Sequence, residues 1–567
     1  MKNLATSDIL VFVIYFLVVA GYGYWIYQRK KKAVTDTHDF FLAEGSLTWW
    51  AIGASLIASN ISAEQFIGMS GDGFFAGIAV AAYEWIAALA LIIIAVWFMP
   101  VYLKNKIFTM PQFLKRRYNG TVSMIMTVFW LFLYVFVNLT SILYLGSAAI
   151  NGLLGGGHLH TIMIVLAVFA LIITLGGMKV IGYTDVIQVG VLIIGGFATI
   201  YFALTIVSEK FGLGRDAIAG FKVLLKEAPE HFHMIFNKPD PDASQLEIDK
   251  YLILPGLAMY FAGQWIVNLN YWGCNQYITQ RALGADLKTA RTGILFAGFL
   301  KLLMPVIVML PGIAAFVLNK GHHLENFNGS KDTAYSAVLS FLPSGLKGLS
   351  IAALTAAIVA SLAGKLNSIA TIYTLDIHKK YISKNADEKK QVWTGRITVW
   401  VAMFIALLFT WEDLLGIKRE GGFTFIQKYT GFISPGVFAM FILGMFWKRT
   451  TGTAAVAGLV TGLVMAVFFN NYAPSVFGHE TWLYTAYPTQ EKIDGIMQTV
   501  WRIPFLINMG WAFFFTMLVM IIISLRGPKV NPKAFILDKA MFKLSPGHII
   551  MIVVTLLILA ALYIKFW

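Results

Sequence analysis

Apolar and polar positions along the chain separate into long blocks. Apolar runs of about 20 residues, enough to cross a bilayer as a helix, recur from one end to the other. The period-two alternation of a membrane β-barrel is absent from the sequence. The pattern predicts an all-α polytopic protein with about fourteen transmembrane helices, over residues 8–27, 47–71, 77–103, 120–150, 160–177, 180–208, 251–278, 290–318, 346–377, 393–411, 423–446, 450–471, 501–525 and 545–566.

The second span is interrupted by polar residues in "LIASNISAEQFIGMSG", residues 56–71. Irregular backbone survives at membrane depth only where it lines a cavity or is buried in protein. Broken helices of this kind hold ions and substrates in transporters. Helix–helix contact through small polar residues is the competing interpretation. The number of polar groups favours a binding site; they are Ser59, Asn60, Ser62, Glu64 and Gln65, with Gly68 and Gly71 behind them.

A similar interruption occurs some 200 residues later, in "GQWIVNLNYWGCNQYITQR", residues 263–281. Four amide side chains surround the Tyr271–Trp272 pair there. Two interrupted spans at this separation fit an inverted repeat whose first helices meet at the membrane midplane. The amide residues are Asn268, Asn270, Asn275 and Gln276.

Ionisable residues inside membrane spans are costly and usually functional. Glu84 and Lys301 lie deep in apolar runs, so we expect them to pair with each other or to line a wet cavity. Asp185 lies nearer the end of a span. For Lys365, snorkelling to the membrane interface and a site in the protein interior are equally compatible with the sequence.

Hydrogen-bonding side chains are spread over several spans and predict a substrate site for a neutral polyhydroxylated ligand. One carboxylate and one ammonium leave this set near neutral, which suits neither an anion nor a cation. Tyr271 and Trp272 could stack on a sugar ring, although packing alone explains single aromatic residues. The candidate set is Gln65, Glu84, Asn138, Asn268, Lys301 and Gln427.

The coupling mechanism must draw on an ion gradient, because the sequence has no ATP-binding loop. Hard cations such as Na⁺ prefer several oxygen ligands. The hydroxyl of Ser361 and carbonyls of a broken helix near Ala58 and Ile61 could supply them. No metal-binding or nucleophile motif appears either, so we expect no enzyme activity.

Composition supports a membrane protein: 58% of residues are hydrophobic and 13% are charged, with a mean hydropathy of +0.71. Well over half of the 44 Lys and Arg residues fall in loops that would be inside if the N-terminus is outside, which predicts both termini outside. This distribution explains the net charge of +15 without nucleic acid. The first span, without a cleavage signal, is expected to stay uncleaved. Cys274, the single cysteine, excludes an intrachain disulfide.

Ordered motifs from about residue 8 to residue 450 resemble the sodium/solute symporter family, and within it the bacterial sodium/glucose-galactose cotransporters. These motifs are "ASNISAEQFIGMSG", "YEW", "VNLTSILYLG", "TDVIQV", "NQYITQR", "FLKLLMPVIVMLPGIAA", "LNSIATIYTLDI" and "YTGFISPG". The resemblance implies a LeuT-type five-plus-five inverted repeat with extra flanking helices. It divides the chain into an N-terminal extra helix and basic inner loop (1–46), a ten-helix transport core (47–446) and C-terminal extra helices (447–567).

The resemblance also implies roles for individual residues. The substrate site would comprise Gln65, Glu84, Asn138, Asn268, Lys301 and Gln427, with Asn60 close by. Gate residues would be Met69, Tyr83 and Phe423 on the outer side and Tyr271 with Trp272 on the inner side. Na⁺ would bind carbonyls of Ala58, Ile61 and Ala357 and the hydroxyl of Ser361, with Asp185 on its exit path. Ala87 stands where close relatives have a sugar-site serine, which implies a looser hydroxyl selectivity. Ala360 replaces the first serine of the family's Ser-Ser pair and leaves Ser361, which favours one coupled ion over two.

The sequence therefore predicts a multi-pass protein of a bacterial inner membrane that couples a sugar of the glucose or galactose type to Na⁺ by alternating access. Symport of inositol, another polyol or a different small solute is the alternative of the same class. A membrane enzyme acting on a lipid-linked sugar and a channel remain rival classes. The oligomeric state is left open by the sequence.

Overall fold

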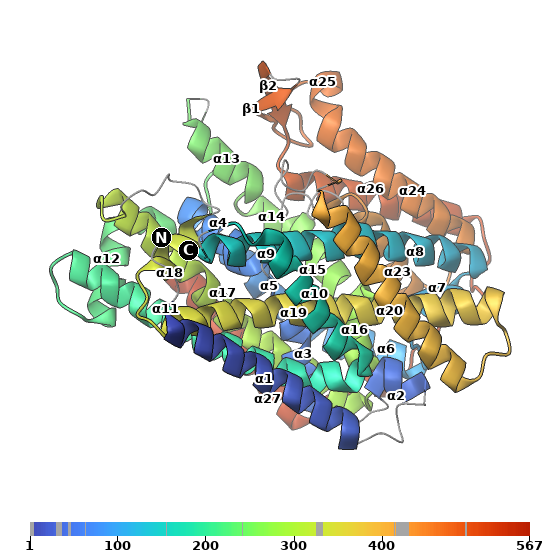
Figure 1. The fold of residues 1–567 in the computed structure, drawn as a ribbon. Helices are drawn as coiled ribbons and strands as arrows, with labels where there is room; N and C mark the ends of the chain where they lie inside the picture. The colour runs from blue at the N-terminus through green and yellow to red at the C-terminus, as the bar shows by residue number, and fades with distance from the viewer. Residues whose placement is uncertain are drawn as a thin grey trace.

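Long helices packed side by side make up most of the computed structural model (Figure 1). It describes residues 5–29, 37–43, 47–62, 64–154, 156–240, 242–324, 333–412, 414–415, 430–493 and 496–567. Within these residues, ten helices are long and apolar enough to cross a membrane, or eleven if one strongly bent pair is a single span. Shorter apolar helices and the first half of a broken helix occupy the other predicted positions.

The first part of the chain, up to Lys210, forms the elements α1 to α11. Its elements are α1 (Thr6–Arg29), α2 (Thr37–Leu42), α3 (Trp49–Asn60), η3 (Glu64–Met69), α4 (Ser70–Ala76), η4 (Gly77–Ala81), α5 (Ala82–Ile93), η5 (Ile94–Phe98), α6 (Met99–Lys104), α7 (Met110–Arg117), α8 (Gly120–Phe132), η6 (Leu133–Leu139), α9 (Thr140–Leu153), α10 (Leu159–Leu175) and α11 (Gly177–Lys210). The segments η3, η5 and η6 are π-helical. Such wide turns often occur at functional sites.

The rest of the chain completes the bundle and adds a small β-hairpin. Its elements are α12 (Ala217–Glu227), η7 (Pro229–Phe232), α13 (Gln245–Ile253), α14 (Ala258–Phe261), α15 (Gly263–Cys274), α16 (Gln276–Leu283), α17 (Leu287–Lys320), α18 (Ala334–Ser340), α19 (Leu346–Ile372), η9 (Tyr373–Ile382), α20 (Glu388–Trp411), α23 (Ser434–Phe446), α24 (Gly452–Asn471), α25 (Ala473–Phe477), β1 (Tyr487–Ile493), β2 (Ile496–Arg502), α26 (Phe505–Leu525), η10 (Lys539–Phe542) and α27 (Pro546–Phe566).

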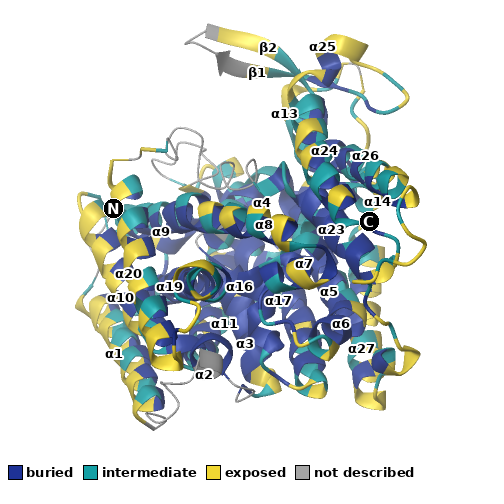
Figure 2. Cartoon of the chain, turned by 90° about the vertical axis from the view of Figure 1, so that its right-hand side faces the viewer, coloured by how far each residue is buried: buried dark blue, intermediate teal, exposed yellow. Residues whose placement is uncertain are grey.

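Burial distinguishes the central helices from those at the periphery (Figure 2). In the most apolar part of the span formed by α19 and η9, 83% of residues are buried, against 22% in α1 and 11% in α27. A helix that is apolar on all sides and buried on all sides belongs to the core of a large protein. The exposed apolar surfaces of α1 and α27 suit contact with lipid, as expected for supporting helices outside the transport core.

The described parts of three long polar loops, residues 209–250, 319–345 and 472–500, lie together on one face of the bundle. The Lys320 ammonium donates to the Glu227 carbonyl at 2.5 Å, and the Gln245 amide donates to the Pro488 carbonyl at 3.1 Å. The hairpin β1–β2 projects from this face together with α13 and α25 (Figure 1). These contacts connect all three long loops.

Both chain ends reach the same face as these loops. The backbone N–H of Met234, in the 209–250 loop, donates to the Phe566 carbonyl at 2.7 Å. Near the N-terminus, the Asp8 carboxylate accepts from the N–H groups of Gly345 and Gly348 at 2.7 and 2.9 Å. An acid at this position satisfies free donors at the start of α19 and complements the helix dipole. The fourteen spans that the sequence predicts would also place both termini on one face.

Candidate functional site

The predicted interruption of the second span is present as a broken helix. Helix α3 ends at Asn60, and Ile61 has an extended backbone with φ −80° and ψ 116°. The N–H of Ser62, which would bond to Ala58 in a continuing helix, instead donates to the Gln65 side-chain oxygen at 3.1 Å. The break therefore releases carbonyl oxygens at the end of α3 for other partners.

The second predicted interruption contains two breaks. Helices α13–α14 and α15 form a bent pair with an angle of 82°. Helix α15 then ends at Cys274, and Asn275 is extended with φ −90° and ψ 131° before α16 begins. Helices α3 and α15 are each 12 residues long and end in the same way. This similarity agrees with the predicted internal repeat.

A chain of polar contacts crosses the bundle between the two broken helices. The Lys301 ammonium on α17 forms a buried ion pair with Glu84 on α5 and also donates to the side-chain oxygen of Asn60. The amide of Asn60 in turn donates to the hydroxyl of Tyr271 on α15 at 3.0 Å. The predicted pairing of Glu84 with Lys301 is confirmed. Lys301 also lies 5.0 Å from the centre of the Trp272 ring.

This polar chain forms one wall of a cavity of about 180 Å³. All of the predicted substrate residues in the described part of the chain line it: Asn60, Gln65, Glu84, Asn138, Asn268 and Lys301. The predicted gate residues Met69, Tyr83, Tyr271 and Trp272 line it too. Gln427 and Phe423 lie outside the described residues.

Local bonds hold the amide side chains of the cavity in place. The amide nitrogen of Asn268 donates to the Gln264 carbonyl at 3.0 Å, one turn earlier on α15. Gln65 and Asn138 sit on the π-helical turns η3 and η6. A π turn inserts one extra residue into the helical ladder and so changes the direction of the following side chains. Six separate elements, α3, η3, α5, η6, α15 and α17, thereby present polar groups to one cavity.

The predicted ion-binding residues form a second, smaller cluster where α19 crosses the end of α3. Ala58, Ile61, Ala357 and Ser361 are all buried. The hydroxyl of Ser361 donates to the Ser59 carbonyl at 3.3 Å and accepts from the Lys365 ammonium at 2.9 Å. The cluster is rich in oxygen atoms, and the Ser59 hydroxyl has no hydrogen-bond partner among the described residues. Such oxygens suit a hard cation.

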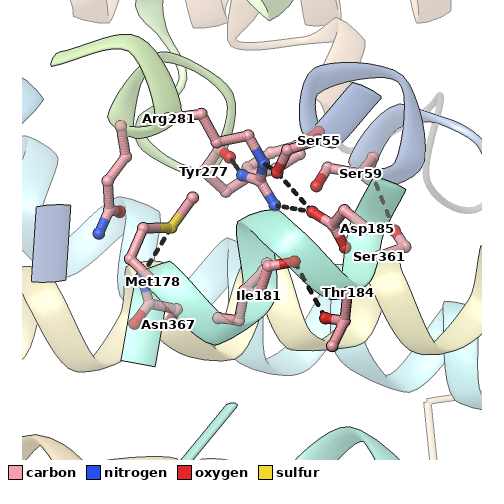
Figure 3. A network of polar contacts seen from close by, with 12 residues as sticks. Ser55, Ser59, Met178, Ile181, Thr184, Asp185, Tyr277, Arg281, Ser361 and Asn367 are labelled. Atoms are coloured by element: carbon pink, nitrogen blue, oxygen red, sulfur yellow. Dashed lines mark hydrogen bonds and ion pairs between the residues drawn. The ribbon is translucent and has the colours of Figure 1, made fainter. Parts of the chain in front are cut away.

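Asp185 lies beside this cluster in a buried network (Figure 3). The hydroxyl of Ser55, one helical turn before Ser59 on α3, donates to one carboxylate oxygen of Asp185. The guanidinium of Arg281 donates to the same hydroxyl at 2.7 Å and lies 3.8 Å from the carboxylate. The second carboxylate oxygen has no hydrogen-bond partner among the described residues. A free oxygen on a carboxylate that is bound to Ser55, one turn before Ser59, is compatible with the predicted ion path.

Sequence reasoning missed several residues that line the cavity. Asp72 on α4 is buried and lies in the cavity wall, although its carboxylate in an apolar context could have been found by the rule applied to Glu84. Tyr134 also lines the cavity and donates to the Asn275 side chain at 3.3 Å. Ser434 accepts from the Asn270 amide at 3.0 Å. A single tyrosine or serine in an apolar span carries no signal that separates it from packing.

Comparison with known proteins identifies the family. The model of the sodium:solute symporter family matches residues 40–462. This chain belongs to the sodium:solute symporter family. As a member, it is a membrane transporter that couples a small solute to Na⁺, and it is not an enzyme.

Among relatives of this symporter, the sodium/glucose cotransporter of Vibrio parahaemolyticus is 41% identical over all of this chain and 99% of its own length. The sodium/myo-inositol cotransporter 2 of Mus musculus is 34% identical, covering 82% of this chain and 70% of the relative. The sodium/glucose cotransporter 1 of Ovis aries is 32% identical, covering 81% and 71%.

The fold of this symporter is similar to that of a solved Na⁺-coupled sialic acid symporter in a substrate-bound, outward-open state. The TM-score is 0.73 at 18% sequence identity, over 93% of this chain and 99% of the other. At this identity the likeness concerns the fold alone. It confirms the predicted fold class, a LeuT-type transporter of membrane-spanning helices.

Proposed function

We propose that this symporter carries a neutral monosaccharide of the glucose or galactose type together with Na⁺ by alternating access. The main support is the cavity wall in which Glu84, Lys301, Asn60 and Tyr271 are joined by consecutive polar contacts. Glu84 and Lys301 form an ion pair, and the other charged residues of the lining, Asp72 and Lys365, are one of each sign, so the lining as a whole favours an uncharged ligand. The 41% identical relative named as a sodium/glucose cotransporter supports the same substrate class.

The hydroxyls of a sugar both donate and accept hydrogen bonds, and the cavity offers both kinds of partner. Glu84 accepts, Lys301 donates, and the amides of Asn138, Asn268 and Gln65 do both. Gln427 would add a further amide. Each amide can bind two neighbouring hydroxyls at once, which distinguishes a polyol from a solute with one polar group.

Aromatic residues would close the cavity around the sugar. Tyr271 packs edge-on against Trp272 with ring centres 5.2 Å apart, so their positions are set jointly. We propose that Tyr271 and Trp272 form the inner gate. Met69, Tyr83 and Phe423 would form the outer gate. Alternating access then requires these two groups to open in turn.

The proposed Na⁺ site comprises the carbonyls of Ala58, Ile61 and Ala357 and the hydroxyl of Ser361. The break after Asn60 supports this assignment, because it removes the helical donor from the Ala58 carbonyl. Na⁺ at this site would tie α19 to the end of α3, and Asn60 at the same break contacts the sugar wall. Ion binding and sugar binding would thereby share one structural element.

Transport by purified protein in sealed liposomes tests the proposed function. We expect accumulation of radiolabelled glucose or galactose under an inward Na⁺ gradient and none under an equal choline gradient. Exchange of labelled for unlabelled sugar should occur at equal Na⁺ on both sides. Accumulation that does not depend on the Na⁺ gradient would contradict the proposal, as would a lack of transport for every sugar tested.

Myo-inositol is the second candidate substrate. It is a neutral ring with several hydroxyls, and relatives named as sodium/myo-inositol cotransporters are 32–34% identical to this chain. Ala87 lines the cavity at a position where the family resemblance implies a serine, which supports a loosened selection among hydroxyl patterns. The sugar panel should therefore include myo-inositol, and a higher kcat/KM for it than for any hexose would favour this candidate.

We further propose that residues 47–446 form the transport core, flanked by 1–46 and 447–567. The charge bias of the loops supports a cell membrane orientation with both termini outside. Together with the bacterial relative, this orientation supports an inner-membrane location in a bacterium. Labelling of single cysteines placed in the hairpin β1–β2 would test the orientation in intact cells.

A further inference from the structure

Lys365 is a buried lysine in the most buried helix of the bundle. Only 4% of its surface is exposed, so its side chain does not snorkel to the membrane interface. Its ammonium donates to the hydroxyl of Ser361, one turn earlier on α19, at 2.9 Å. It also lies 4.4 Å from the centre of the Tyr277 ring. A cation held by an oxygen and an aromatic face needs a function or a strong structural reason.

The partner of this ammonium is the residue assigned to the coupling ion. Ser361 is the side-chain ligand of the proposed Na⁺ site, and its hydroxyl already contacts the Ser59 carbonyl at 3.3 Å. An oxygen lone pair that accepts from an ammonium is not available to Na⁺ in the same arrangement. The ammonium therefore takes one of the two lone pairs with which this hydroxyl could bind the ion.

Charge counting gives an independent reason for conflict. Arg281 and Asp185 belong to the same buried region, since a methyl group added at Gly364 would lie 2.4 Å from the Arg281 guanidinium and 3.1 Å from the Ser59 hydroxyl. The described groups around Ser361 thus include two cations, Lys365 and Arg281, and one carboxylate, Asp185. A bound Na⁺ would be a third cation in this buried region, where like charges repel more strongly than in water.

We propose that Lys365 is a tethered competitor of the coupling ion, whose ammonium occupies the Ser361 position without Na⁺ and is displaced when Na⁺ binds. The proposal rests on the proposed Na⁺ site. Displacement needs somewhere for the ammonium to go, and Lys365 also lines the sugar cavity, between the ion cluster and Tyr277. A four-carbon stem can swing the charge into that polar space without backbone movement. The lysine thereby weakens Na⁺ binding. When Na⁺ is bound, the displaced ammonium adds its charge to the sugar cavity, so the occupancy of the ion site and the charge in that cavity are linked.

Direct Na⁺ binding to purified full-length protein in nanodiscs tests this proposal without requiring transport. The measurement is isothermal titration with NaCl at constant ionic strength, balanced with choline chloride. Lys365→Met removes the charge and nearly keeps the volume, so it should bind Na⁺ at least tenfold more tightly than the wild type. Lys365→Arg keeps the charge and should stay within about threefold of the wild type. Lys365→Gln, also neutral, should change affinity in the same direction as Lys365→Met and decides the outcome if that variant does not fold.

Lys347→Met is the matched control. It removes one positive charge from the same helix, 18 residues earlier and about 27 Å away along the axis, and should leave Na⁺ affinity unchanged. Equal Na⁺ affinity in the wild type and the neutral variants would overturn the proposal, as would weaker binding or no binding in those variants. An equally large gain in Na⁺ affinity in Lys347→Met would overturn it too, because the effect would then come from the overall charge of the protein. Failure of the proposed sugar symport would appear separately, as wild-type liposomes that do not accumulate sugar.

Discussion

The buried ion pair between Lys301 and Glu84 provides a quantitative test of the substrate site. The perturbations are Lys301→Met, Glu84→Gln and the double substitution. Lys301 is completely buried and Glu84 is nearly so. Removal of the lysine alone leaves a carboxylate inside the protein without its countercharge. Lys320→Met, at the exposed end of the same helix α17, is the matched control.

The expected magnitudes follow from this burial. Breaking a buried ion pair by removing one partner typically costs about 3–5 kcal/mol, a large part of the stability of most proteins. The double variant has no buried charge at this place, so we expect it to recover most of that loss. Sugar affinity should not recover, because the ammonium donor is gone and a neutral amide replaces the charged carboxylate acceptor. Each lost bond to a sugar hydroxyl costs about 0.5–1.5 kcal/mol, or roughly two- to tenfold in affinity.

Two assays separate these effects. Thermal unfolding in nanodiscs measures stability, and sugar binding at saturating Na⁺ measures the substrate site. The expected order of stability is wild type, double variant and Lys301→Met, from highest to lowest. A double variant as unstable as Lys301→Met would refute the ion-pair reasoning. A double variant with wild-type sugar affinity would refute the assignment of this pair to the sugar.

Three further predictions concern the ion, the gate and the outer loops. Ser361→Ala should raise the Na⁺ concentration for half-maximal uptake while sugar binding at saturating Na⁺ survives; an unchanged value would remove this hydroxyl from the ion site. Tyr271→Phe should keep more transport than Tyr271→Ala, since it keeps the ring and loses a hydroxyl whose bond from Asn60 is worth about 1 kcal/mol; equal activities would indicate ordinary packing. His231, whose ring nitrogen contacts the Phe74 carbonyl at 3.0 Å, has its pKa lowered chiefly by burial. The unfolded chain then binds more protons than the folded one, so stability should fall as the pH drops below the ordinary histidine pKa of about 6.5; the thermal midpoint of His231→Gln should depend less on pH over that range.

Several features of the site could be predicted from the sequence because their cost in a membrane is local. A charge or an unbonded backbone group in the hydrocarbon core has a high free-energy cost, and this cost does not depend on how the rest of the chain folds. Polarity in residues 56–71 therefore indicated the break that the structure has at Ile61. Glu84 and Lys301 were recognisable for the same reason, and their pairing follows from the expense of leaving either one alone.

Other features were decided only by the tertiary structure, because they depend on which helix faces meet. In α19 nearly all positions are buried, so its sequence pattern distinguishes no outer face and gives no direction for Lys365. Its contact with Ser361, and the position of both beside Ser59 on α3, come from helix packing across some 300 residues of chain. Apolar periodicity reports the difference between buried and exposed faces. Where a helix is buried on every side that difference vanishes, and only the three-dimensional packing determines which side chains meet.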